Sequence, residues 1–195
     1  KFNVTSNDVY WDLIHEGVNA VHDTYNNIGE AFSMPPTNQD LIALLATNQT
    51  NSGVIFMHRY DTTDLWEQMY TIDLPGNAIG TQLSFCSEDK LAITGRMNSN
   101  NCLFIYSKNR SDPNKQFVLY DTLFLPEKDQ NTDLNLNYLS SFAWEKERCF
   151  RFAVGAMSKT KVNNEHIAFK FGRTYIYQSN DFGLRHFITH YHIMP

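Results

Sequence analysis

Residues 78–126 decide the fold, and they read AIGTQLSFCSEDKLAITGRMNSNNCLFIYSKNRSDPNKQFVLYDTLFLP. Four short runs of aliphatic, β-branched and aromatic residues alternate in this stretch with polar segments such as SED and NSNN. Runs of this composition that are bounded by Gly, Pro, Asn, Asp and Ser favour β-strands. The stretch therefore predicts a unit of four short strands.

Much the same pattern lies on both sides of this central unit. Residues 27–33 (NIGEAFS) match residues 78–84 (AIGTQLS), and Leu74-Pro75 matches Leu125-Pro126, each with an offset of 51 residues (78 − 27 and 125 − 74). A looser third copy opens at residue 137 (NYLSSFA). Repeats of about 40–50 residues with four strands each are typical of propeller blades. The sequence predicts an all-β fold, a partial β-propeller of about three four-stranded antiparallel blades.

The repeats divide one domain, residues 1–195, into four consecutive parts. We expect a leading strand segment at 1–25 and blades at 26–76, 77–126 and 127–195. The run Val9 to His15 fits a strand or one turn of helix, and we interpret residues 11–15 as a fragment resembling the last strand of a blade. The extra length of the third blade, mostly in residues 158–170, predicts an extended hairpin.

The succession of a G-x-x-x-S element, an L-A-I-x-G run, an F-I-Y strand and an aromatic strand ending in Leu-Pro resembles FG-GAP-like repeats. The resemblance covers about residues 26–195 and implies β-propeller blades of the kind found in integrin α-chains. The family's calcium loop needs several closely spaced carboxylates. The equivalent loops here read TNQTNSG and RMNSNN, so bound calcium is not expected, nor is any other cofactor.

Charge and hydropathy exclude some classes of partner, and the first residue favours a secreted protein. The formal net charge of −5 disfavours binding to nucleic acid through a basic face. No apolar run approaches the ~20 residues that span a bilayer, so no transmembrane segment is expected. The first residue is Lys1, which fits removal of a signal peptide. We therefore expect an extracellular location.

Three N-glycosylation sequons agree with that location, at Asn3, Asn48 and Asn109. Three is the number that the Asn, Ser and Thr content alone would produce. Asn48 and Asn109 both fall in predicted loops, where a glycan is tolerated.

The three cysteines form an odd set without the spacing of a zinc site. Cys86 and Cys102 lie in one repeat and could form a disulfide if their strands were neighbours. Buried free thiols are the alternative interpretation. As a nucleophile, Cys86 or Cys149 is disfavoured, because each lies in or beside an apolar strand with nothing nearby to lower the thiol pKa.

His186, His190 and His192 share parity, and in a strand they would point to one face and could ligate a metal. A polar outward face of an edge strand is the favoured interpretation, because no Cys, Asp or Glu lies at ligand spacing.

Four carboxylates could converge near one blade edge and act in glycoside hydrolysis, namely Asp129, Asp133, Glu145 and Glu147. The run Glu145 to Arg148 alternates in charge, which favours a solvated hairpin tip. A set of aromatic residues could line a ligand groove, but packing between blades is favoured for most of them; the set is Trp66, Phe85, Phe104, Tyr106, Phe117, Phe142, Trp144, Phe152, Tyr175 and Tyr177.

Three blades cannot close a ring, and an unclosed array leaves sheet edges and blade faces exposed. We therefore expect a homo-oligomer or an assembly with other protein subunits. The favoured function is a non-catalytic, extracellular structural or adhesive glycoprotein module that self-assembles through incomplete propeller edges. Two alternatives remain open at this point: a propeller-scaffold enzyme such as a glycoside hydrolase, and a propeller module that binds peptides or glycans.

Overall fold

The computed structural model describes residues 2–5, 8–11, 24–60, 65–109, 111, 114, 116–124, 134–143, 150–162, 166–179 and 191–193. Side chains are described for residues 24–60, 66–109, 111, 114, 116–124 and 154. The described part contains β-strands and one 3₁₀ turn, η1 (Pro75–Asn77). The expected all-β class is thus confirmed.

Twelve of the strands form three antiparallel sheets of four, and in each sheet the strands follow one another in chain order. The first sheet contains β3 (Asn27–Ser33), β4 (Leu41–Thr47), β5 (Ser52–Tyr60) and β6 (Leu65–Asp73). The second sheet contains β7 (Ile79–Ser87), β8 (Lys90–Met97), β9 (Asn100–Lys108) and β10 (Phe117–Phe124). The third sheet contains β11 (Leu134–Ala143), β12 (Phe150–Val162), β13 (His166–Ser179) and β14 (Tyr191–Ile193).

Short turns with suitable residues connect the strands. Met97 lies opposite Asn100, so β8 and β9 are joined by the two residues Asn98 and Ser99. Both adopt positive φ angles, 50° and 68°. Two-residue hairpin loops with positive φ at both positions match the right-handed twist of the flanking strands. The local sequence thereby fixes the register between β8 and β9.

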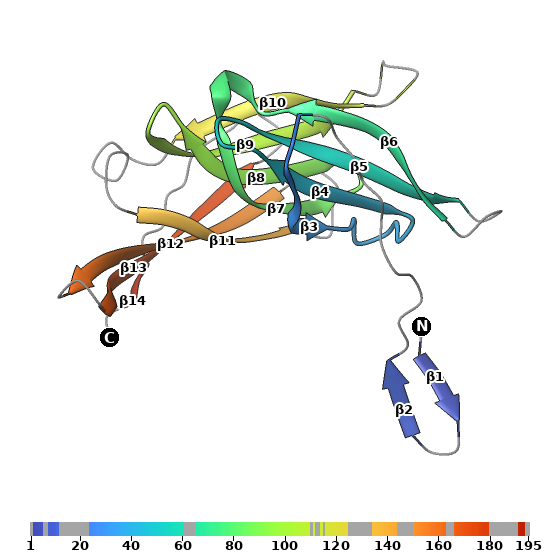
Figure 1. Ribbon diagram of the computed structural model, residues 1–195, viewed down its shortest axis with the longest axis horizontal. Helices are drawn as coiled ribbons and strands as arrows, with labels where there is room; N and C mark the ends of the chain where they lie inside the picture. Colours follow the sequence, from blue (N-terminus) through green and yellow to red (C-terminus); the bar gives the residue numbers. More distant parts are fainter. Residues whose placement is uncertain are drawn as a thin grey trace.

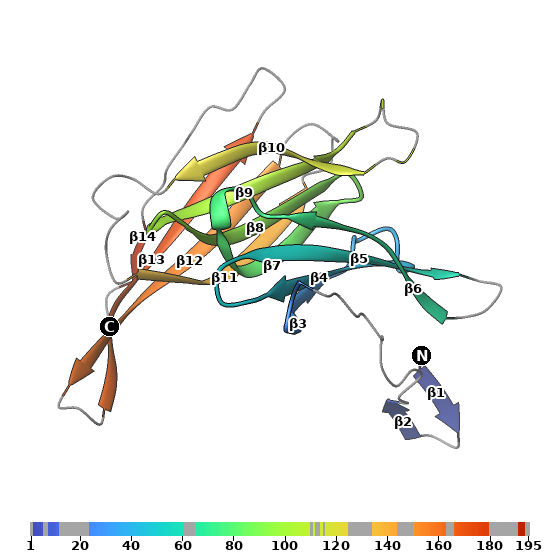
Figure 2. The same cartoon turned by 45° about the horizontal axis from the view of Figure 1, so that its top comes forward.

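The three sheets are stacked, with the second sheet in the middle (Figures 1 and 2). β7 contacts β3, β4 and β5 on one side, and β11 contacts β7, β8 and β9 on the other. The first strands of the three sheets therefore lie next to one another. In the described part of the chain the sheets do not close into a ring (Figure 2).

The main hydrophobic core lies between the first and second sheets. Phe56, which is fully buried, stacks on Tyr70 at 4.7 Å and on Phe117 at 5.1 Å between ring centroids. Phe117 also meets the ring of Phe85 edge-on at 5.8 Å. Aromatic pairs of this kind contribute about 0.5–1.5 kcal/mol each beyond the burial of their area. These rings join strands of the two sheets.

Strand registers relate the three sheets position by position. A Ser of the first strand lies opposite an Ala of the second, and that Ala lies opposite a large apolar residue of the third. The equivalent sets are Ser33, Ala43 and Phe56; Ser84, Ala92 and Ile105; and Ser140, Ala153 and Ile176. Ser33 and Ser84 keep the sequence offset of 51 residues (84 − 33). The three sheets thus share one pattern of paired residues.

The amino-terminal residues form a separate two-stranded hairpin, β1 (Phe2–Thr5) with β2 (Asp8–Trp11) (Figure 1). Trp11 is the last residue of β2 and lies opposite Phe2. In the structure Trp11 thus pairs within this hairpin and not with one of the three sheets. The remainder of the expected strand fragment, residues 12–15, lies outside the described residues.

Candidate functional site

Cys86 and Cys102 are free thiols in this structure, and both are buried. Cys86 lies on β7 and Cys102 on β9, and β8 lies between these two strands. The expected disulfide required neighbouring strands, so this geometry does not provide it. The Sγ atoms instead face backbone carbonyls, Cys86 that of Lys90 and Cys102 that of Gly95, each at 3.6 Å.

Burial raises the pKa of both thiols to about 12, since an apolar surrounding disfavours the charged thiolate. The thiolate is the nucleophilic form of cysteine, and it is scarce at neutral pH when the pKa is this high. These two residues therefore act as small apolar core residues. Cys149 lies outside the described residues.

Only one of the three candidate histidines lies in the described part of the chain. His186 and His190 lie outside the described residues, and His192 lies on β14 opposite Arg173. Within the part of the chain whose side chains are described, no three His, Cys, Asp or Glu residues are grouped closely enough to hold a metal ion. The four carboxylates considered for hydrolysis, Asp129, Asp133, Glu145 and Glu147, also lie outside the described residues.

The first loop sequon, at Asn48, is part of the turn between β4 and β5. Asn48 Oδ1 accepts hydrogen bonds from the backbone N–H of Thr50 at 2.8 Å and of Asn51 at 2.7 Å. Its Nδ2 donates to the Thr24 carbonyl at 3.0 Å. A glycan on Asn48 would be attached at this Nδ2, so glycosylation of the folded chain would disturb the bond to Thr24.

The second loop sequon, at Asn109, presents a different environment. Asn109 is exposed, and its Oδ1 accepts a hydrogen bond from the Ser111 N–H at 3.1 Å, which is the pattern of an Asx turn. Asn3 lies on β1 opposite Tyr10. Of the two loop sequons, Asn109 is therefore the more accessible.

Most aromatic residues considered for a ligand groove are core residues where their side chains are described. Phe85, Phe104, Tyr106 and Phe117 are buried in the core between the first and second sheets. Trp66 is partly buried and packs on a second apolar cluster of the first sheet. The packing interpretation is thus confirmed for these residues; the side chains of Phe142, Trp144, Phe152, Tyr175 and Tyr177 lie outside the described part.

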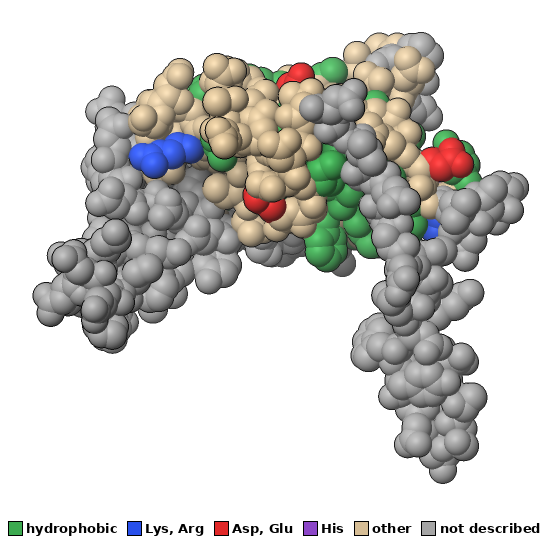
Figure 3. Space-filling view, in the orientation of Figure 1, with side chains coloured by type: hydrophobic (Ala, Val, Ile, Leu, Met, Phe, Trp, Pro, Cys, Tyr) green, Lys and Arg blue, Asp and Glu red, His purple; other side chains and the backbone are tan. Residues whose placement is uncertain are grey.

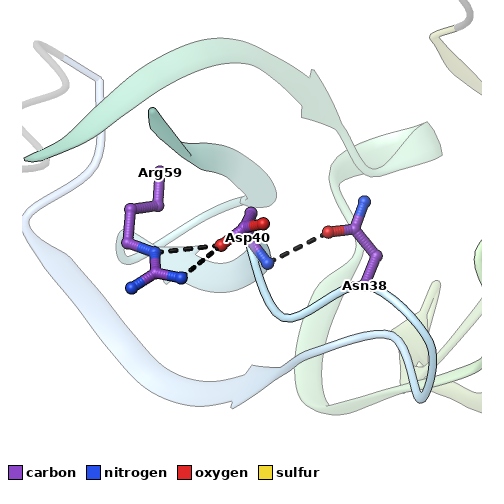
Figure 4. A network of polar contacts seen from close by, with 3 residues as sticks. All are labelled: Asn38, Asp40 and Arg59. Carbon is purple, nitrogen blue, oxygen red and sulfur yellow. Dashed lines mark hydrogen bonds and ion pairs between the residues drawn. The ribbon is translucent and has the colours of Figure 1, made fainter. Parts of the chain in front are cut away.

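A small polar network closes the end of the β4–β5 hairpin (Figure 4). Arg59 donates to Asp40 Oδ1 from Nε at 2.9 Å and from a terminal nitrogen at 2.6 Å, and its backbone N–H donates to the Asp40 carbonyl at 2.8 Å. The Asp40 N–H in turn donates to Asn38 Oδ1 at 3.0 Å. Arg59 and Asp40 are both used to fix the chain, so this network serves the fold.

A tyrosine and an aspartate hold the other end of the first sheet. Tyr25, which is buried, donates its hydroxyl hydrogen to Asp73 Oδ1 at 2.5 Å. Burial, together with this carboxylate, raises the Tyr25 pKa. A Cβ at position 53 would lie 2.5 Å from Tyr25 Oη, so this close approach requires glycine at Gly53.

Two serines join the first and second sheets, and the sequence gives no sign of them. The buried Ser52 Oγ accepts a hydrogen bond from the Gly80 N–H at 2.9 Å, and Ser33 Oγ accepts one from the Phe85 N–H at 3.0 Å. The partners lie 28 and 52 residues away along the chain. A single serine that belongs to no local motif cannot be recognised from the sequence as a link between sheets.

The edge strand β10 exposes several large apolar side chains. Val118, Leu119, Tyr120 and Phe124 are each between 41% and 58% exposed. Among the described strands β10 pairs with β9 alone, and its register shifts between Leu119 and Asp121. β6, the corresponding edge of the first sheet, exposes Glu67, Gln68 and Met69. The two outer edges thus differ, and β10 is the apolar one.

Comparison of the chain with models of known protein families and with curated proteins finds no match. Among the described residues, no helix has the length and apolar character needed to cross a bilayer.

Proposed function

We propose that the chain is a non-catalytic structural or adhesive module, a partial β-propeller of FG-GAP-like blades, that assembles through its open sheet edges. The order of strands in each sheet and the adjacency of β3, β7 and β11 support the propeller arrangement. The polar groups of the junctions support a structural role, because Ser33, Ser52 and the Asp40–Arg59 pair hold strands and sheets together.

The apolar edge of β10 carries the proposal of assembly. An edge strand presents unpaired backbone N–H and C=O groups, and folded proteins usually protect such edges with charges, proline or short strands. The outward side chains of β10 are mainly apolar, so pairing with another strand would bury them as well as satisfy the backbone. The edge of a sheet in a second copy of the chain is the partner that fits.

The experiment compares Val118→Lys with Val118→Thr by light scattering on the full chain. The wild-type protein is expected to form particles above the 22.6 kDa of one chain. Lysine at this edge should lower the mass, because it places a charge where the second strand would pack. Threonine keeps the β-branched shape and should retain assembly. A wild-type protein that stays at 22.6 kDa at every concentration would overturn the proposal.

Secretion is the second part of the proposal, and the exposed sequon at Asn109 supports it. Expression through a secretory pathway should give a glycan at Asn109, measured as a mass change after enzymatic removal of N-glycans. Asn109→Gln should abolish that change, while Asn48→Gln should leave it in place, because the Asn48 Nδ2 is held by Thr24. An unmodified Asn109 in secreted protein would contradict this part.

A further inference from the structure

The face of the first sheet that points away from the second sheet corresponds to a face of the second sheet that is buried inside the molecule. Phe32 precedes Ser33 and lies opposite Leu44, as Leu83 precedes Ser84 and lies opposite Ile93. Phe32 and Leu83 are therefore equivalent, and Met34 is the equivalent of Phe85. In the described part of the chain, the first sheet lacks a preceding sheet of the kind that covers Leu83 and Phe85 in the second sheet.

The equivalent residues differ in exposure. Leu83 and Phe85 are only 4% and 3% exposed, because they pack in the core between the first and second sheets. Phe32 is 66% exposed and Met34 is 39% exposed. A large apolar side chain at this position of a blade is thus covered where a preceding sheet is present, and it is open on the first sheet.

The surroundings of Phe32 and Met34 are apolar. Ile28, Ile42 and Trp66 are partly buried and pack on a cluster that contains Leu44 and Met57. Hydrophobic side chains gather over β3 and β4 in the space-filling view (Figure 3). An exposed apolar patch continuous with a buried cluster is typical of an interaction surface.

We propose that this face, defined by Ile28, Phe32, Met34 and Ile42, receives the third sheet of a second copy of the chain. The proposal rests on the assembly proposed above and names one of its interfaces. The face of the first sheet that packs on the second offers small residues, Ala31 and Ala43, between larger ones. The third sheet has the same register: Ala153 lies opposite Ile176, as Ala43 lies opposite Phe56.

The residues that form the hydrogen bond between the first and second sheets also have equivalents at the proposed interface. Ser33 Oγ accepts the Phe85 N–H within one chain. Ser140 holds the register position of Ser33 in the third sheet, and Met34 holds the position of Phe85 in the first. The third sheet of one copy and the first sheet of the next thus carry the two residues that would form this link.

The interface is heterologous, since it joins two different surfaces of the chain, and such interfaces form rings when the rotation closes. Two copies supply six sheets, which lies within the about 4–8 blades of closed propellers. The expected particle of this interface is therefore a dimer of 45.2 kDa (2 × 22.6).

The test uses full chains whose β10 edge is blocked by Val118→Lys, so that only the proposed face remains for assembly. This variant is expected at 45.2 kDa by light scattering, and the added substitution Phe32→Asp should reduce it to 22.6 kDa. Phe32→Leu, which introduces the residue of the equivalent position, should keep the dimer. Phe32 is exposed, so the aspartate variant is expected to unfold at the same urea concentration as its parent when both are kept dilute enough to be monomeric.

A cross-linking measurement identifies the partner surface. Chains with Met34→Cys and chains with Ser140→Cys, both carrying Cys149→Ser, should form a covalent dimer under mild oxidation when mixed, and neither should do so alone. An edge-blocked variant that is monomeric, or a dimer that persists with Phe32→Asp, would overturn this interface. If the wild-type protein still assembles in that case, the proposed function stands; if it never exceeds 22.6 kDa, both fail.

Discussion

β3 and β7 occupy the same place in two consecutive sheets, yet their surroundings differ. β7 lies between the first and third sheets and contacts both, and its Leu83 and Phe85 are buried. β3 contacts β7 on one side, and on the other side Phe32 in β3 and Met34 directly after it are exposed. The residue type at these positions is thus apolar in both strands, and only the presence of a neighbouring sheet separates a core residue from a surface residue.

The largest expected difference between the two strands is in stability. Leu83→Ala should lower the free energy of unfolding by about 2–5 kcal/mol, because it leaves a cavity in the core between the sheets. Phe32→Ala, at the equivalent position, should change it by no more than about 0.5 kcal/mol when the chain is kept dilute enough to be monomeric. Urea unfolding of both variants gives the comparison. Equal losses would show that the two strands have the same surroundings.

The next largest loss of stability is expected for the hydrogen bonds between the first and second sheets. Ser52→Ala leaves the buried Gly80 N–H without its acceptor, which should cost about 1–3 kcal/mol of unfolding free energy. Ser33→Ala removes the acceptor of Phe85 N–H in a part-buried position and should cost less, about 1 kcal/mol. The urea midpoint of each variant measures the difference. A larger loss for Ser33→Ala would contradict the deeper burial of the hydrogen bond to Ser52.

Tyr25 belongs to the apolar cluster on the open side of the first sheet. Its raised pKa means that the folded protein retains the phenolic proton at a pH where the unfolded chain loses it. Stability is therefore full below the ordinary tyrosine pKa of about 10 and falls as the pH rises above it. Tyr25→Phe should lose about 1.5 kcal/mol at neutral pH, with the bond to Asp73.

The pH profile separates this role from simple packing. In the Tyr25→Phe variant the decline of stability above about pH 10 should become shallower. It should not vanish, because burial also raises the pKa of Tyr106. Urea unfolding at neutral and at alkaline pH measures both slopes. Parallel profiles for the variant and the wild-type protein would contradict the buried hydrogen bond.

The smallest effect is expected at the Asp40–Arg59 pair, whose side chains are about one-third exposed. Arg59→Ala should cost at most about 1 kcal/mol, because solvent screens an exposed ion pair. The loss should shrink in high salt. Asp40→Asn provides the matched control, since it keeps the shape of the side chain. A loss above about 2 kcal/mol that is insensitive to salt would show that the pair is more deeply buried than its geometry indicates.

The strands of the first two sheets could be predicted because their signals are local. Residues 41–46 form an apolar run between turn residues, and β4 occupies Leu41–Thr47 as a largely buried strand. The expected extended hairpin in the third copy also agrees with β12 and β13, which pair as far as Val162 and His166. Alternation, turn residues and repeat length were sufficient for these features.

Features that depend on distant parts of the chain could not be predicted. Whether Cys86 and Cys102 meet depends on which strand lies between their own strands, and the repeat pattern alone does not fix that order. The roles of Ser33 and Ser52 depend on N–H groups of another sheet. The β1–β2 hairpin was not predicted, because residues 1–7 are mostly polar and the alternation at Phe2 and Val4 is too short to indicate a strand.

The mass of the full-length chain in solution, measured by light scattering over a series of concentrations, tests the central claim most directly. An array of sheets with an apolar edge at β10 and an open face at β3 should assemble, with a species of 45.2 kDa (2 × 22.6) as the smallest complex. The mass should rise with concentration as further copies pair at β10. A constant mass of 22.6 kDa up to the limit of solubility would contradict the account.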